Sequence, residues 1–264
     1  MTGPDILLTN DDGIDATGLR VLADALSEIG SVTVVAPADD QSAVGRALSR
    51  SVSVDERDIG YALDGTPADC VIAGLEALAP ETDLVVAGCN RGANLGAYNL
   101  GRSGTVSAAV EATFFDIPAI AMSLYIPVAA DTAYQSVDVN PRAYSQASRA
   151  ATFLADHAIE AGVFDQADYL NVNTPVPEQA TGEMVVTRPS HVHRMNAVRE
   201  GDHVELQEGI WELMANGDIP DDEGTDRRAV VDGHVSVSPL TAPHTTEHHE
   251  ALDGLATAYP DSDD

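Results

Sequence analysis

Short apolar runs alternate with amphipathic segments along the first 125 residues of the chain. Residues 5–9 read DILLT and stop at the polar sequence NDDG, a pattern typical of a buried strand followed by a turn. Residues 18–29 instead place leucine, alanine and isoleucine at the three- and four-residue intervals of a helix. The same patterns predict further strands at 32–36, 52–54, 61–63, 84–87 and 119–123, and further helices at 68–78 and 107–115.

The predicted strands are apolar throughout and alternate with helices, which favours a mostly parallel sheet covered on both faces. A long helix at 143–161 and a strand at 169–172 continue this order. Beyond them, 183–187, 204–206 and 234–239 resemble pieces of hairpins among acidic loops, and the polar stretch from about residue 243 is expected to fray. We predict a single α/β unit over 1–264, with its core in 1–180 and a hairpin region in 181–264.

The charge balance is strongly acidic, with 43 Asp and Glu against 13 basic residues and a net charge of -30. Lysine is absent from the sequence, so all the basic residues are arginines. A surface of this kind repels a nucleic-acid polymer, which is bound through Lys and Arg that replace phosphate counterions. Carboxylates spread over the whole chain instead indicate a protein adapted to concentrated salt, where self-repulsion is screened.

No apolar run approaches the roughly 18 residues that a membrane span needs, and the first residues lack the basic start of a secretory signal. We therefore expect a cytoplasmic protein without a membrane partner. Cys70 and Cys89 are far apart and form no CxxC pair, so we predict two reduced, buried thiols.

The first cluster of candidate functional residues is Asn10-Asp11-Asp12-Gly13, directly after the first strand. Adjacent carboxylates repel each other unless a cation lies beside them, and a hard cation such as Mg²⁺ prefers such oxygen ligands. A plain turn that caps the next helix is the alternative interpretation. This motif alone does not decide between the two interpretations. In an open α/β sheet, however, ligands bind where the carboxyl ends of strands meet, and three such ends carry polar clusters here.

Two further clusters follow later strands. The sequence APADDQS after the second strand offers the hydroxyl of Ser42 and the amide of Gln41, although an ordinary acidic loop is the preferred interpretation of this motif taken alone. The sequence GCNRGANLG leads to Ser103-Gly104-Thr105 immediately before a helix, where free N–H groups and hydroxyls favour a phosphate. Arg91 and Arg102 lie in the same stretch, and guanidinium groups bind phosphate well. Together the three loops predict a hard-metal site open to phosphate and water.

These motifs resemble those of the SurE family, the survival-protein phosphatases that act as 5′/3′-nucleotidases. The resemblance rests on ILLTNDDGIDATGLRVLADAL, VVAPADDQS, LDGTPADCV, DLVVAGCNRGANLG and SGTVSAAVEA, and extends more weakly through NVNTP, VTR, Trp211, GTD and VSVSPL. It implies a three-layer Rossmann-like core with a mostly parallel, mixed sheet. It also implies a hairpin and C-terminal arm exchanged between subunits of a homodimer or homotetramer.

The resemblance also assigns roles to residues of the three clusters. It implies one divalent metal ion per subunit (Mg²⁺, Mn²⁺ or Co²⁺) held by Asp11, Asp12, Ser42 and Asn90. The implied substrate is a nucleoside monophosphate, with its phosphate against Asn94, Ser103, Gly104 and Thr105. The implied catalytic residues are Asp11 and Asp12. The chain departs from the family at Cys89, where isoleucine is usual, and at Arg102, where tyrosine is usual. Arg102 either strengthens phosphate binding or balances local carboxylates.

Three alternatives follow from the same residues. Asp11 could itself be the nucleophile and form an aspartyl-phosphate, in place of attack by a metal-activated water. A non-catalytic nucleotide-binding sensor could use the same scaffold, although the set of implied metal ligands is complete. A dinucleotide-dependent dehydrogenase is disfavoured because NDDG follows the first strand where G-x-G-x-x-G is required. The histidines of SHVHR have chelating spacing, but a surface hairpin is the preferred interpretation, and no Ser/His/Asp triad is indicated.

Overall fold

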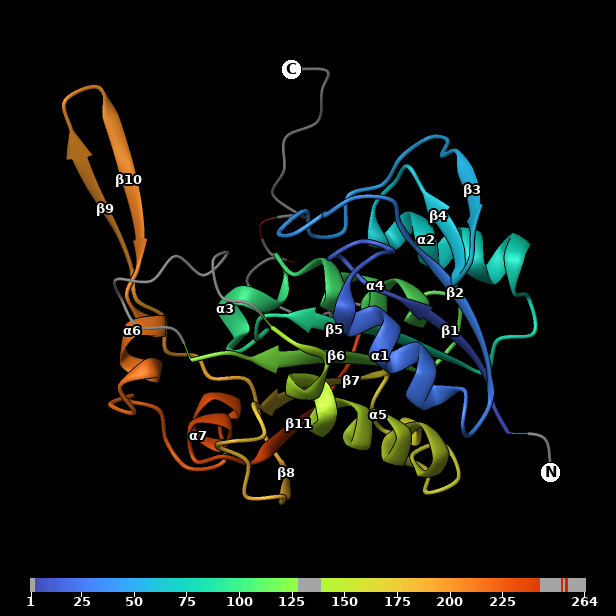
Figure 1. Cartoon of the computed structure of the whole chain (residues 1–264). Helices are drawn as coiled ribbons and strands as arrows, with labels where there is room; N and C mark the ends of the chain where they lie inside the picture. The colour runs from blue at the N-terminus through green and yellow to red at the C-terminus, as the bar shows by residue number, and fades with distance from the viewer. Residues whose placement is uncertain (1–2, 128–138, 243–252, 254, 256–264) are drawn as a thin grey trace.

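The computed structural model describes residues 3–127, 139–242, 253 and 255. Within this part of the chain a large nine-stranded sheet runs through the molecule, and a separate two-stranded hairpin projects from it (Figure 1). The order across the large sheet is β3 (Val54–Arg57), β4 (Gly60–Leu63), β2 (Ser31–Pro37), β1 (Asp5–Thr9), β5 (Leu84–Arg91), β6 (Ala119–Tyr125), β7 (Tyr169–Pro175), β11 (Val235–Leu240) and β8 (Met184–Val186). The six strands from β4 to β7 are parallel, whereas β3 and β11 pair antiparallel to their neighbours β4 and β7.

Helices cover both faces of this sheet. Successive side chains of a strand point to opposite sides, and because the central strands are apolar throughout, both faces must be buried. In β1, Ile6 and Leu8 pack in the core that includes α1 and α5, whereas Leu7 packs in the core that includes α2 and α4. The three-layer α/β prediction is therefore confirmed. The helices are α1 (Thr17–Leu26), α2 (Pro67–Ala73), α3 (Ala97–Leu100), α4 (Gly104–Thr113), α5 (Ser145–His157), α6 (Ile210–Ala215) and α7 (Asp226–Val231), and a π-helical turn (Gly74–Leu78) extends α2.

Successive strands are added to opposite sides of β1. From β1 the chain passes to β2 on one side, and later returns to β5 on the other side. At such a switch point the connections leave the neighbouring strands in opposite directions and open a crevice beyond their carboxyl ends. The segments that follow β1 and β5 therefore meet at the place where an α/β sheet binds its ligand.

Two sequence predictions for the second half are wrong. The segments 183–187 and 234–239 were expected as hairpin pieces, but β8 and β11 belong to the large sheet, where β11 pairs with β7. The serine and proline residues of β11 give it a polar sequence pattern, although Ser236 and Ser238 are fully buried. The large sheet thus draws strands from both sides of residue 180.

The hairpin predicted around 204–206 is present. β10 (His203–Glu208) pairs antiparallel with β9 (Met195–Glu200), and the pair extends away from the body of the molecule (Figure 1). β9 itself, α3, α6 and α7 were not predicted. The expected exchange of a C-terminal arm between subunits stays a prediction. The fraying tail from about residue 243 lies, apart from 253 and 255, outside the described residues.

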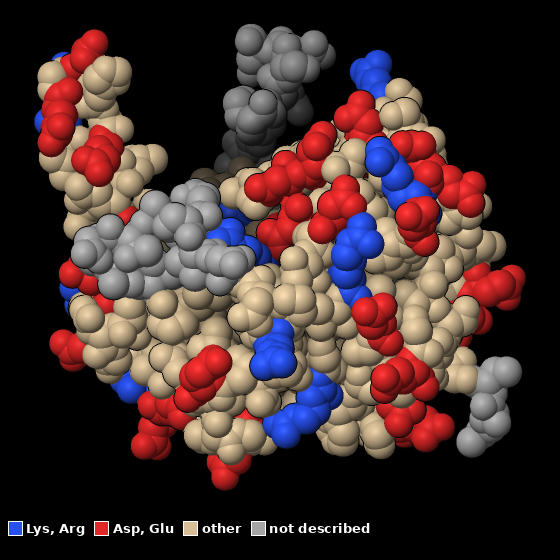
Figure 2. All heavy atoms as spheres, in the orientation of Figure 1, with Lys and Arg blue, Asp and Glu red and all other residues tan. Residues whose placement is uncertain are grey.

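Acidic side chains are scattered over the face seen in Figure 2, both on the body and on the projecting hairpin. Their wide spread agrees with a surface adapted to salt. Among the described residues, none of the helices is both long and apolar enough to cross a membrane.

Candidate active site

The carboxylate of Asp11 lies against the N-terminus of α4. Its Oδ1 accepts a 2.5 Å hydrogen bond from the hydroxyl of Thr105, and its side chain is almost fully buried. Gly104 permits this approach, since an added Cβ would lie 2.7 Å from Cβ and 2.8 Å from Oδ2 of Asp11. Ser103 caps the helix by accepting the N–H of Val106 at 3.0 Å. A helix N-terminus carries partial positive charge, so it stabilises an anion at this position.

Asp12 connects the end of β1 to the end of β5. Its Oδ2 accepts a 2.8 Å hydrogen bond from the backbone N–H of Arg91. Asn90, one residue before Arg91, donates its Nδ2 to the carbonyl of Gly92 at 2.7 Å. This bond fixes the side-chain amide, so its Oδ1 points away from Gly92. The structure therefore brings the first and third predicted clusters together.

The loop after β2 contacts the end of β1. The N–H of Gln41 donates to the carbonyl of Asp11 at 2.7 Å, and the predicted residue Ser42 directly follows this contact in the chain. The hydroxyl of Ser42 donates to Oδ1 of Asp40 at 2.6 Å. Asp40 was not singled out from the sequence. Its negative charge acts on both Asp11 and Asp12, so three carboxylates influence one another here.

Burial and mutual repulsion disfavour the ionised carboxylates. Burial raises the pKa of Asp11 above its ordinary value, against the hydrogen bonds from Thr105. Burial, and then the neighbouring Asp11, raise the pKa of Asp12 to about 7. The backbone N–H and the positive charge of Arg91 both act to lower the pKa of Asp12. An additional cation placed beside the pair would relieve this unfavourable charge.

Asn94 is buried against two asparagines of β7. Its backbone N–H donates to Oδ1 of Asn173 at 2.8 Å, and its carbonyl accepts from Nδ2 of Asn171 at 2.9 Å and of Asn173 at 3.1 Å. Its own Nδ2 donates to Ser123 at 3.0 Å. The two asparagines of β7 were missed from the sequence, although polar amides inside a buried strand are a signal that a partner must exist.

The residues outside this crevice take other roles. Arg102 lies 4.0 Å from the centroid of the Tyr98 ring, and His193 stacks on the same ring at 5.2 Å. Within the described residues Arg102 forms no ion pair, so its main contact is aromatic. Cys70 and Cys89 are buried and unpaired, as predicted. His244, His248 and His249, in the polar C-terminal stretch, lie outside the described residues.

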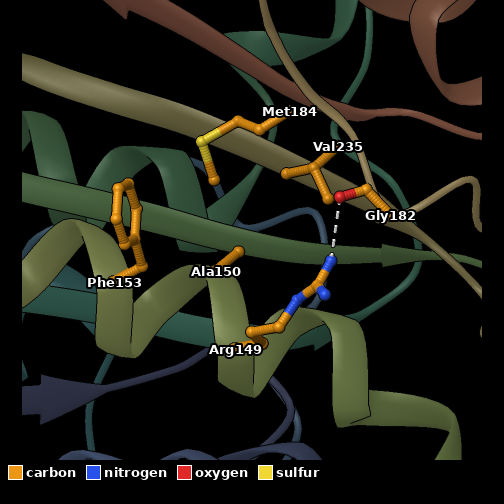
Figure 3. Close-up of a pocket in the computed structure, with 6 residues that line it drawn as sticks. All are labelled: Arg149, Ala150, Phe153, Gly182, Met184 and Val235. Atoms are coloured by element: carbon orange, nitrogen blue, oxygen red, sulfur yellow. Dashed lines mark hydrogen bonds between the residues drawn. The ribbon is translucent and has the colours of Figure 1, made fainter.

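A separate hollow of about 230 Å³ lies between α5 and the strands β8 and β11 (Figure 3). Its one charged lining side chain, Arg149, donates to the carbonyl of Gly182 at 3.1 Å. The remaining surface is largely apolar and offers none of the predicted site residues. The lining residues are Arg149, Ala150, Phe153, Gly182, Met184 and Val235.

The fold and the site define a class: an α/β protein whose switch point places a carboxylate pair beside the N-terminus of a helix. The family model described as "Survival protein SurE" matches residues 6–196. The chain belongs to the SurE family.

Known proteins similar to this chain cover almost all of its length. A protein named 5′-nucleotidase SurE from Haloarcula marismortui is 66% identical over 263 residues, which span 100% of this chain and 98% of the relative. One of the same name from Syntrophotalea carbinolica is 41% identical and spans 89% of this chain and 90% of the relative. The crystal structure of the SurE protein from Aquifex aeolicus superimposes with a TM-score of 0.76 at 29% identity, over 97% of this chain and 100% of that chain. Relatives at 62–66% identity come from halophilic archaea, in agreement with the predicted salt adaptation.

Proposed function

We propose that this chain is a divalent-metal-dependent phosphomonoesterase that releases phosphate from nucleoside 5′-monophosphates. The observation that carries the proposal is the contact of Asp11 with Thr105, which joins a carboxylate pair to the N-terminus of α4. A cation bound by the carboxylates and a phosphate bound at the helix would then be direct neighbours. The name 5′-nucleotidase, carried by relatives up to 66% identical, supports the substrate class.

The donor set suits one divalent cation per subunit, of the class Mg²⁺, Mn²⁺ or Co²⁺. Carboxylate, hydroxyl and amide oxygens are the ligands that hard cations prefer. No group of three or more His, Cys, Asp or Glu side chains with a metal-binding arrangement occurs in the described part of the chain. The proposed site therefore combines two carboxylates with two neutral oxygens. Its ligands are Asp11, Asp12, Ser42 and Asn90.

Each residue has a distinct role in the proposed hydrolysis. A bound divalent cation supplies Lewis acidity and positive charge to the attacking water and the phosphate. Asp11, held in place by Thr105, orients that water and accepts its proton, while Asp12 completes the carboxylate pair. The N-terminus of α4 stabilises charge that develops on the phosphate oxygens. The phosphate contacts are Asn94, Ser103, Gly104 and Thr105.

The test is phosphate release from a panel of nucleoside 5′- and 3′-monophosphates in molar KCl, with Mg²⁺, Mn²⁺ or Co²⁺ and with EDTA. Wild type and Asp12→Asn are compared on the same panel. Turnover that stops in EDTA and falls steeply in the variant supports the proposal. Folded wild-type protein that binds nucleotides without releasing phosphate from any of them would replace it with a nucleotide sensor.

The same preparation distinguishes the two chemical routes. Attack by water leaves no covalent intermediate, whereas attack by Asp11 forms an aspartyl-phosphate that a beryllium fluoride mimic would trap. We infer also that the protein works in the cytoplasm as a homodimer or homotetramer. Light scattering of the full chain in molar KCl tests the oligomeric state.

A further inference from the structure

A buried carboxylate outside the proposed metal site holds the loop that carries Asn94. Asp226, the first residue of α7, is fully buried. Its Oδ2 accepts the backbone N–H of Gly96 at 2.7 Å, and its Oδ1 accepts that of Ser190 at 2.9 Å. Because both oxygens accept hydrogen bonds, this geometry suits the ionised form. The contact connects positions that are 130 residues apart in the chain.

Arg227 contacts the same loop from the next position of α7. Its guanidinium is fully buried, donates to the carbonyl of Val192 at 2.5 Å and to that of Leu95 at 3.4 Å, and lies 3.6 Å from Asp221. The packing against Gly96 is so close that an added Cβ there would lie 2.2 Å from Nη2 of Arg227. Gly96 also has a φ of +80°, which residues with a side chain rarely adopt, so both the backbone and the packing favour glycine at this point of the loop.

The loop is held from its other side by β7. Asn171 and Asn173 bond to the backbone of Asn94, while Asp226 and Arg227 bond to the two residues that follow it. Three consecutive residues thus have their backbone positions fixed by elements from the second half of the chain. A backbone fixed in this way pre-orients the side chain that it carries, and this lowers the cost of ordering it around a ligand.

We propose that Asp226 and Arg227 are positioning residues, which hold the 94–96 loop so that Asn94 meets the substrate phosphate. This inference rests on the proposed function, since the phosphate contact of Asn94 is part of it. Neither residue is proposed to touch the substrate or the metal. Burial raises the pKa of Asp226 from its ordinary value, and the N–H donors of Gly96, Ser190 and Arg227 oppose the shift by stabilising the carboxylate.

The test compares Asp226→Asn with the wild-type holoenzyme in molar KCl. Asparagine keeps the size of the side chain but replaces one acceptor oxygen with an NH₂ group, so either Gly96 or Ser190 loses its acceptor. We expect KM for the nucleotide and Ki for inorganic phosphate each to rise about tenfold or more, the usual effect of losing a buried hydrogen bond to a charged group. Mn²⁺ affinity, measured by titration, is expected to stay unchanged, because three of the proposed ligands lie on other loops and Asn90 is held in β5 by its own bond to Gly92.

Two further variants separate positioning from general stability. Asp232→Asn at the other end of α7 removes only a surface contact of 3.4 Å with Arg228, and is expected to match wild type. Gly96→Ala keeps Asp226 but collides with Arg227, and is expected to raise KM and Ki as Asp226→Asn does. A lower melting temperature alone, with wild-type KM and Ki in the folded protein, would overturn the inference. Failure of both site variants to fold would also overturn it, because the contact would then serve folding and not positioning.

The controls also distinguish this inference from the proposed function. If wild type and Asp232→Asn release no phosphate in any metal, the proposed function fails, whatever Asp226 does. If both turn over normally and Asp226→Asn keeps their KM and Ki, only the positioning role is lost.

Discussion

Thr105, on the first turn of α4, donates its hydroxyl to Oδ1 of Asp11 at the end of β1, across 94 positions of sequence. Both side chains are buried, so water does not replace this bond when it is lost. The bond fixes the orientation of the carboxylate that we assign to metal binding and to proton transfer. Because the Thr105 hydroxyl donates its hydrogen to Asp11, it cannot donate the same hydrogen to a phosphate. The donors left for the phosphate are chiefly backbone N–H groups and Ser103.

The first prediction concerns that hydroxyl. Thr105→Val keeps the shape of the side chain but leaves Oδ1 of Asp11 without its donor. Loss of a buried hydrogen bond to a charged group costs about 1.5–3 kcal/mol, so kcat/KM is expected to fall about 10- to 100-fold. Thr105→Ser retains the donor and is expected to recover most of the activity. Equal activity of the valine and serine variants, measured by phosphate release, would contradict the role assigned to the bond.

The second prediction concerns the close approach of α4 to Asp11. A Cβ at Gly104 would lie 2.8 Å from Oδ2 of Asp11, so Gly104→Ala must displace the helix or the carboxylate. We expect activity to fall at least about 100-fold and stability by about 1–3 kcal/mol, as overpacked sites do. Gly101→Ala is the matched control, because nothing lies within 4 Å of the added Cβ at that position. The comparison requires kcat/KM and the denaturation midpoint of both variants.

The third prediction uses the charge repulsion in the crevice. In EDTA, Asp12 lies partly buried beside Asp11 with Asp40 nearby, and this arrangement of charges destabilises the folded protein. Asp12→Asn removes one of these charges and is expected to raise the melting temperature of the metal-free protein. Added Mn²⁺ should stabilise wild type by binding to the folded state, and the variant much less.

The control for this prediction is an exposed acidic residue whose ion pair lies outside the carboxylate cluster. Asp15→Asn alters a surface pair with Arg20 and should leave both the melting temperature in EDTA and the Mn²⁺ effect unchanged. A variant Asp12→Asn that melts below wild type in EDTA would show that the carboxylate is stabilising without metal. The proposed cation site would then lose its main physical support.

Sequence pattern predicted the first half of the fold well, because its strands are continuous apolar runs that end at clear turn signals. The predicted bounds of β1 match the structure. The helix predicted at 68–78 matches α2 and its π-helical extension to within one residue. β11 was misassigned because VSVSPL reads as a polar, proline-containing piece, although its serines are buried beside β7. The short helix α7 lacks a long apolar periodicity and was missed.

The site was only partly predictable for a related reason. Asp11, Asp12 and the SGT sequence are conspicuous because they follow strands or precede a helix. The partners of Asn94 are spread over β7 and α7, and no local spacing connects them to the loop. Contacts between distant segments depend on the register of the whole sheet, which local pattern does not contain.

The last prediction concerns acid stability. Burial acts to raise the pKa of Asp69, but hydrogen bonds from Thr66 and Ser49 outweigh it, and the pKa is lowered below its ordinary value of 3.8. Asp69 accepts the N–H of Thr66 at 2.8 Å in a capping box at the start of α2, and that of Ser49 at 2.8 Å. Asp69→Asn is expected to cost about 1–2 kcal/mol at neutral pH.

The sign of the pH dependence follows from the lowered pKa. The stability that the ionised Asp69 contributes is complete above the unfolded-state pKa of 3.8, and is lost as the pH falls through the lower folded-state value. In molar KCl at pH 7, the melting temperature of wild type should therefore be higher than that of Asp69→Asn. This difference in melting temperature should shrink below pH 3.8. Asp64→Asn, whose side chain is exposed, is the control and should follow wild type throughout. A difference between Asp69→Asn and wild type that does not change with pH would mean that the contribution of Asp69 is steric and does not depend on its charge.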